Sequence, residues 1–256
     1  MQFYHYSFRP KLISTLATLA AITVMIMLGQ WQSSKATQKQ SMQDTYDART
    51  TQMAERITPD ELNAEALRYK KVVVSGNYET HFQILLDNRV QDDKAGYHVI
   101  TPFRISGSER YILINRGWVP LGADRAVLPE IKTPDGMIEL SGIAMLPPSK
   151  LYELEQPESL DSGWQIVWQN MDLVRFRKAV PFSLQPLIIQ LDQTSPGGFV
   201  RNWSRPDDRV ATHLGYAFQW YGMAVMLALF YFFVTFKKIP GKKIPDDKFN
   251  QTGIKS

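Results

Sequence analysis

The sequence predicts an α+β membrane protein in which two transmembrane helices, one near each end, flank a mainly antiparallel β domain with short helices. Two observations support this prediction. Uncharged apolar residues concentrate in two segments, 12–28 and 214–236, and each has the character of a bilayer span. The residues between them are more polar and contain short strand candidates separated by turn residues, which is typical of an antiparallel sheet.

The first apolar segment, residues 12–28, would span about 25 Å as an α-helix. Trp31 extends it into the interfacial zone, where tryptophan is favoured, so the sequence predicts a transmembrane helix over residues 12–31. A cleaved signal peptide is the alternative, with Ser34-Lys35-Ala36 as a weak cleavage site. The length of the apolar run, and the polar residues that separate it from that site, favour the helix.

The second segment, residues 214–236, would span about 34 Å and is apolar on every side, which predicts a transmembrane helix over residues 213–236. Basic residues lie outside both segments: Arg9 and Lys11 before the first, and Lys237, Lys238, Lys242 and Lys243 after the second. Because basic flanks favour the cytoplasm, we expect residues 1–11 and 237–256 to be cytoplasmic. The domain over residues 32–212 then lies on the opposite side.

We also expect the two helices to pack closely, because both contain small residues that let backbones approach. These residues are Ala17, Ala20 and Ala21 in the first helix and Gly222, Ala224 and Ala228 in the second. Such residues are common in any membrane helix, so the pattern alone does not define the contact.

The central domain begins with a polar stretch, residues 34–70, that predicts a helix interrupted near Pro59. Thr58 would cap a new helix there, since Pro59 follows it and Glu61 stands three residues on. The chain then changes to short apolar segments bounded by turn residues. The strand candidates begin at Val72 and then cover Phe82–Asn88, Tyr97–Arg104, Tyr111–Val119, Met137–Met145, Gln165–Trp168 and Leu187–Leu191. A short helix is expected over Asp172–Ala179, with Asp172 as its cap, and a loop over Thr194–Asp208.

Several function classes are excluded or disfavoured by what the sequence lacks. It has no cysteine, which excludes disulfides and thiolate chemistry. Its histidines, His5, His81, His98 and His213, show no i, i+4 pair of the kind that binds a metal on a helix. No nucleophile elbow, phosphate-binding loop or dinucleotide fingerprint is present, and the basic residues form no stripe suited to nucleic acid. We therefore expect no catalysis; a membrane-tethered hydrolase with a triad around His98 is the least favoured class.

His213 stands at the outer mouth of the second predicted helix. Tyr216 and Trp220 follow at i+3 and i+7, so the spacing predicts that all three share a face. A neutral imidazole there could ligate a haem iron, with the aromatic rings covering the macrocycle. An interfacial histidine in an ordinary aromatic belt is the alternative. Gln219 also faces the membrane and needs a polar partner.

A set of short motifs recurs in a fixed order along the chain. The motifs are Phe8-Arg9-Pro10, Leu28-Gly29-Gln30-Trp31-Gln32, Leu85–Val90, Gly96–Phe103, Asn115-Arg116-Gly117-Trp118-Val119-Pro120, Gly198-Phe199-Val200-Arg201 and His213–Trp220. Together they resemble the Surfeit locus protein 1 family of cytochrome c oxidase assembly factors. The resemblance extends from Phe8 to about Phe236.

The resemblance implies a protein of the bacterial inner membrane, with its central domain periplasmic, that helps to place haem a into the catalytic subunit of an aa3-type oxidase. It implies that His213 ligates the haem iron, and we expect Tyr216, Gln219 and Trp220 to complete the cofactor site. The implied partners are the lipid bilayer and cytochrome c oxidase subunit I, with haem a synthase as a further candidate. A cofactor-free scaffold that holds an immature oxidase subunit is the alternative function.

Further contact residues are expected in the central domain. Arg104 and Arg116 could pair with haem propionates or oxidase carboxylates, or each could form an internal salt bridge, and the sequence does not separate these two possibilities. Asn115 and Trp118 belong to the same motif as Arg116 and are expected to contribute to the same contact surface.

Overall fold

The computed structural model describes residues 5–8, 10–122, 124–147, 164–206 and 209–239. The chain divides into two compact units, one made of residues 1–40 and 208–256 and the other of residues 41–207. Arg9, Lys242, Lys243 and the rest of the predicted cytoplasmic tail beyond residue 239 lie outside the described residues. The predicted α+β class, with an apolar helix near each end and a β-rich domain between them, is confirmed.

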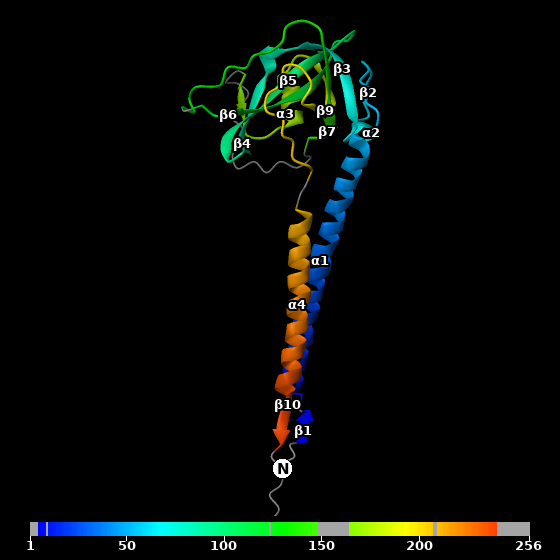
Figure 1. Ribbon diagram of the computed structural model, residues 1–256, viewed down its shortest axis with the longest axis vertical. Helices are drawn as coiled ribbons and strands as arrows, with labels where there is room; N and C mark the ends of the chain where they lie inside the picture. The colour runs from blue at the N-terminus through cyan, green and yellow to red at the C-terminus, as the bar shows by residue number, and fades with distance from the viewer. Residues whose placement is uncertain (1–4, 9, 123, 148–163, 207–208, 240–256) are drawn as a thin grey trace, which may run out of the picture. The chain divides into compact units, whose positions relative to one another are not determined.

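The two apolar helices are α1, Leu12–Thr50, and α4, Val210–Thr235 (Figure 1). Both are long and apolar enough to cross a membrane, by length and composition. Helix α1 continues without a break beyond the predicted span 12–31, because the residues that follow contain no glycine or proline up to Thr50. Helix α4 begins three residues before His213 and ends just before Phe236.

Helices α1 and α4 pack along one seam. Shielded positions recur every three or four residues in both helices, which is the spacing of a single helix face. They are Thr15, Thr18, Ile22, Met25, Gly29, Gln32 and Ala36 in α1, and His213, Ala217, Trp220, Ala224, Leu227, Tyr231 and Thr235 in α4. Gly29 permits a close approach of the helices, because a Cβ at this position would lie 2.6 Å from the ring of Tyr221. Of the small residues expected at the contact, Ala224 lies in the seam, whereas Ala17, Ala20 and Ala228 are exposed.

A two-stranded antiparallel sheet joins the start of α1 to the end of α4, at the opposite end of the helical unit from His213. Strand β1, His5–Phe8, precedes α1, and strand β10, Phe236–Ile239, follows α4. Phe8 lies opposite Phe236. The pairing continues the antiparallel course of the helices. The sequence did not predict it, because four residues are too few to show a period.

The predicted helix start at Thr58 is wrong. Residues 58–63 are not helical; the chain instead forms the short strand β2, Glu55–Arg56, and then the one-turn helix α2, Ala64–Leu67. The cap is Asn63, whose side chain accepts from the amide of Ala66. Burial explains the difference, because Ile57 packs into the core and its amide donates to Val73 O at 2.8 Å. Tertiary contacts thus outweigh a local capping pattern.

The second unit is built on an eight-stranded, mainly antiparallel sheet (Figure 1). Its order is β2, β3 (Lys71–Tyr78), β7 (Ile138–Met145), β9 (Ser183–Leu191), β6 (Arg110–Pro120), β5 (Lys94–Ile105), β4 (Ile84–Gln91) and β8 (Val167–Trp168). A further pairing between β3 and β5 closes five of the strands into a small barrel, which leaves these strands without free edges. The pairings β2–β3, β4–β8 and β6–β9 are parallel.

The strands predicted by periodicity are all present, and two hydrophobic clusters use opposite faces of the sheet. Strand β6 shows the division, since Ile112 and Ile114 enter the cluster inside the barrel and Leu113 enters the other. That second cluster packs against helix α3, Leu173–Ala179, whose predicted cap is confirmed by bonds from two amides to the Asp172 carboxylate. Strand β9 begins four residues earlier than expected. A register shift against β6 accommodates Pro186 within it.

Arg116 is a fully buried charge in the barrel wall. Its Nε donates to Gly197 O at 2.7 Å, its Nη1 to Thr133 Oγ1 at 2.7 Å and to Gln83 Oε1 at 3.3 Å, and its Nη2 to Lys132 O. The guanidinium also lies over the rings of Tyr78 and Phe199. No carboxylate among the described residues pairs with it.

The segment after Arg116 is held against residues 197–201. Trp118 exchanges two backbone hydrogen bonds with Val200, and Phe199 N donates to Arg116 O at 2.8 Å. Gly117 has φ +117°, and a Cβ there would lie 2.7 Å from Val200 O, so only glycine fits. Backbone hydrogen bonds therefore pair two motifs that are far apart in the sequence, Asn115–Pro120 and Gly198–Arg201.

We predict that Arg116→Met lowers the free energy of unfolding by about 3 kcal/mol or more, because the oxygens that accept from the buried guanidinium lose their charge-assisted donor. Arg104→Met is the matched control. Its ion pair with Glu109 is largely exposed, so a loss below about 1 kcal/mol is expected. Urea unfolding of the detergent-solubilised protein, followed by tryptophan fluorescence, measures both. Equal effects of the two variants would contradict the structural role assigned to Arg116.

His98 gives the domain a pH-dependent stability. Burial lowers the pKa of His98 to about 4, and the nearby Arg89 adds to the shift. An unfolded chain takes up the proton below about pH 6.5, whereas the folded chain resists it, so stability is present above that pH and is lost as pH falls towards 4. We predict a loss of about 2 kcal/mol between pH 7 and pH 5. Chemical unfolding at both values should show a flatter profile in His98→Gln; an unchanged profile would contradict the assignment.

Candidate functional site

His213 lies in the first turns of α4 and is half-buried in the seam with α1. Its ring nitrogen Nδ1 lies 2.7 Å from Oε1 of Gln32. Gln32 belongs to α1 and is also half-buried. This bond joins residues 181 positions apart in the sequence, within the helical unit.

The bond with Gln32 sets the chemistry of the His213 ring. An amide oxygen only accepts hydrogen bonds, so this contact matches the tautomer in which Nδ1 carries the hydrogen and Nε2 keeps its lone pair. Metal-binding histidines are commonly oriented in this way, with the second ring nitrogen donating to a protein acceptor. The geometry therefore leaves Nε2 of His213 as a nitrogen able to ligate a metal.

The three other residues expected at this site do not all share the face of His213. Trp220 lies in the seam with His213 and is half-buried, whereas Gln219 is exposed and Tyr216 is 50% exposed. Tyr216 stands about 60° around the helix from His213, which is enough to take it off the α1 contact. The structure thus places His213 and Trp220 two turns apart on the seam side of α4, with His213 bonded to Gln32, and leaves Tyr216 and Gln219 exposed.

The expected contact residues of the central domain have internal partners. Arg104 bonds to Glu109 and to Ser108 O, which is the internal ion pair that the sequence left open. Arg116 is fully buried, so the predicted contact with a propionate or an oxidase carboxylate does not fit it. Its partners among the described residues are neutral oxygens and aromatic rings, so Arg116 does not form the expected internal salt bridge with any of them.

Asn115 and Trp118 likewise serve the fold. Asn115 Oδ1 accepts from Gly117 N at 3.2 Å, and its Nδ2 lies 3.4 Å from His98 Nδ1. Trp118 is 6% exposed and donates from Nε1 to Arg89 O at 2.8 Å. A surface contact role does not fit either residue.

His98 has structural partners, Asn115 and an edge-on contact with Trp203. No serine or carboxylate among the described residues hydrogen-bonds to its ring, so a triad around His98 has no support. No group of three or more His, Asp or Glu side chains suited to a metal occurs in the described part of the chain either. Sequence reasoning missed Gln32; the only available signal was its place in the motif Leu28–Gln32.

The model of the SURF1 family matches residues 19–225 of this chain. A SURF1-like protein of Rickettsia felis is 25% identical over 85% of this chain and 95% of its own length. A SURF1-like protein of Monosiga brevicollis is 28% identical over 84% of this chain and 85% of its own. Surfeit locus protein 1 of Xenopus tropicalis is 27% identical over 77% and 67%. The chain therefore belongs to the SURF1 family, whose members are known in general as oxidase assembly factors.

Proposed function

We propose that this chain binds haem a through Nε2 of His213 and assists its insertion into subunit I of an aa3-type cytochrome c oxidase. The observation that carries the proposal is the contact between Nδ1 of His213 and Oε1 of Gln32, which matches a ring whose Nε2 is oriented as a ligand. Membership of a family of oxidase assembly factors supports an oxidase subunit as the destination of the haem.

The surface next to His213 on α4 suits a haem. A haem needs a ligand nitrogen beside apolar surface, and the neighbours of His213 on α4 supply such surface. Leu214, the next residue, and Tyr216, three residues on, are 53% and 50% exposed. Trp220 would act from the seam, by supporting the helix contact at His213, and Gln219 would offer a hydrogen-bonding group on the outer face.

We further infer a bacterial inner-membrane location with both termini in the cytoplasm and the domain of residues 41–207 in the periplasm. The support is the pair of apolar helices together with the basic residues outside them. Haem a synthase is the further partner that this location would bring within reach.

We predict that His213→Ala lowers the haem a bound per protein by about tenfold or more, because it removes the proposed iron ligand. The protein is purified from cells that make haem a, and bound haem is measured by absorbance and mass. His81→Ala is the matched control, since His81 is an exposed histidine of the other unit, and should leave the content unchanged. Equal haem in all three proteins would exclude His213 as principal ligand. Cross-linking to the oxidase without any haem would favour the cofactor-free scaffold.

A second prediction concerns Gln32. Gln32→Leu removes the acceptor for Nδ1–H, so we expect haem affinity to fall about 10- to 100-fold, the usual range for lost partners of a ligand. Gln32→Glu keeps an acceptor and should retain binding while lowering the reduction potential of the bound haem. The control is Gln30→Leu, at an exposed position two residues earlier on α1.

The tautomer of His213 can be read without haem. Nitrogen-15 NMR of the histidine-labelled, haem-free protein should show Nδ1–H as the major form, and Gln32→Leu should redistribute the proton between the two nitrogens. A wild-type spectrum with the hydrogen on Nε2 would contradict the ligand assignment, whatever the haem content.

A further inference from the structure

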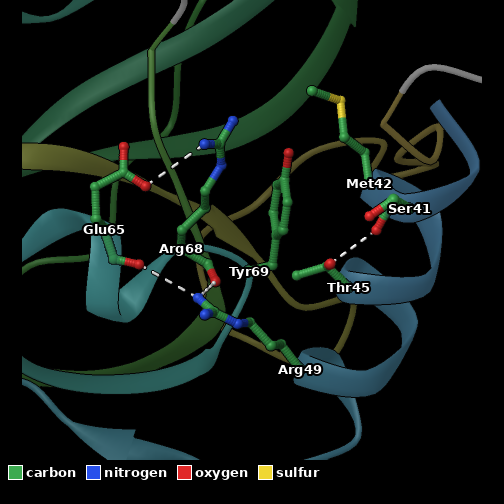
Figure 2. Close-up of a pocket in the computed structure, with 7 residues that line it drawn as sticks. All are labelled: Ser41, Met42, Thr45, Arg49, Glu65, Arg68 and Tyr69. Atoms are coloured by element: carbon green, nitrogen blue, oxygen red, sulfur yellow. Dashed lines mark hydrogen bonds and ion pairs between the residues drawn. The ribbon is translucent and has the colours of Figure 1, made fainter. Parts of the chain in front are cut away.

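A pocket of about 180 Å³ lies between the last turns of α1 and the segment that contains α2 (Figure 2). It belongs wholly to the unit of residues 41–207. Helix α1 contributes Ser41, Thr45 and Arg49, and the facing segment contributes Glu65, Arg68 and Tyr69. None of these residues belongs to the site at His213, so the chemistry of the pocket is independent of the proposed haem binding.

Two guanidinium groups and one carboxylate give the pocket a net positive charge. Arg49 bonds through Nη1 to Arg68 O at 2.9 Å and to Glu65 O at 3.3 Å, and no carboxylate among the described residues pairs with it. Arg68 pairs with Glu65 only at 3.5 Å, and the Glu65 side chain is 73% exposed. An exposed pair at this distance neutralises little of the charge.

Arg68 also has an unused donor. Its Nε is buried and has no hydrogen-bond partner, which is uncommon for a buried polar atom and calls for an explanation. Arg49 and Arg68 use only Nη1 in hydrogen bonds among the described contacts. Besides this buried Nε, the Nη2 groups of Arg49 and Arg68 have no protein acceptor among the described contacts, and both side chains line the pocket.

The backbone at Tyr69 is shaped to bring two successive side chains to this pocket. Tyr69 has φ 64°, a left-handed conformation that bulky side chains rarely adopt. It is held by its own amide, which donates to Ala144 O at 2.7 Å, and by the edge-on ring of Tyr46. Arg68 stacks on the Tyr69 ring, and in Figure 2 its guanidinium and the Tyr69 hydroxyl extend the same way. Backbone strain of this kind concentrates at ligand sites.

We propose that this pocket binds a phosphate group. Planar guanidinium forks match the oxygens of phosphate and of carboxylate. The hydroxyls of Ser41 and Tyr69 add further donors, which favours phosphate because it has more oxygens than a carboxylate. The phosphate could belong to a soluble phosphate ester or to a phospholipid headgroup, and both present the same oxyanion to Arg49 and Arg68.

The test uses the full chain in an uncharged detergent, titrated with inorganic phosphate at constant ionic strength and followed by calorimetry. Arg68→Gln should weaken binding about tenfold or more, as expected for the loss of a charge-assisted contact. Arg56→Gln is the matched control, because Arg56 is an exposed arginine of the same unit paired with Glu139, and it should bind phosphate as the wild type does. Ser41→Ala, at an exposed position, should weaken binding severalfold and serves if Arg68→Gln does not fold.

The same titration in nanodiscs separates the two sources of phosphate. Loss of the phosphate signal in phosphatidylglycerol discs, with retention in detergent, would identify a lipid headgroup as the occupant. Retention in both would identify a soluble phosphate compound. The proposal would be overturned if phosphate did not bind in detergent and the nanodisc titrations did not differ with lipid composition. Equal losses of phosphate affinity in Arg68→Gln and Arg56→Gln would also overturn it.

Discussion

The buried guanidinium of Arg116 is the interaction on which the β domain depends. The carbonyls of Lys132 and Gly197 lie in irregular segments, where no strand ladder satisfies them, so their donors must come from elsewhere in the fold. One planar group with five donors reaches both, together with Thr133. Burial raises the pKa of Tyr78 to about 12, so the ring under the guanidinium stays neutral. The cation is therefore stabilised by oriented dipoles and aromatic faces, and no carboxylate in the described part of the chain serves as its counter-ion.

The helical unit uses a related device, in which polar pairs are placed within an apolar seam. His213 bonds to Gln32, and Tyr231 bonds to Thr15, so each polar pair joins α1 to α4. Apolar helix faces can slide by a turn at little cost, whereas a slip would leave these polar groups unpaired, and such groups specify register. The strands β1 and β10 fix the same antiparallel register from the far end of the unit. The position of His213 is thus determined by several contacts.

The features that the sequence predicted correctly are those that depend on residues close together in the chain. The alternation in β3 and β7, the apolar run of β6 and the Asp172 cap were readable, because side-chain period and capping act over a few residues. Thr58 was misread because the burial of Ile57 involves strands far along the chain. At the site, His213 was found from its position at a helix mouth, but its partner Gln32 lies 181 positions away. The buried state of Arg116 was equally invisible, since it depends on loops that pattern does not place.

The identity of the His213 partner bears on how a carrier can give up its cargo. Metal-binding histidines often donate to carboxylates, which raise the basicity of the ligating nitrogen and strengthen the metal bond. Here the acceptor is the neutral amide of Gln32, which orients the ring and adds less basicity. A carboxylate at this place in an apolar seam would also be costly to bury. Under the proposed function, a neutral acceptor therefore combines a defined ligand direction with a bond weak enough to be exchanged for the ligands of the receiving subunit.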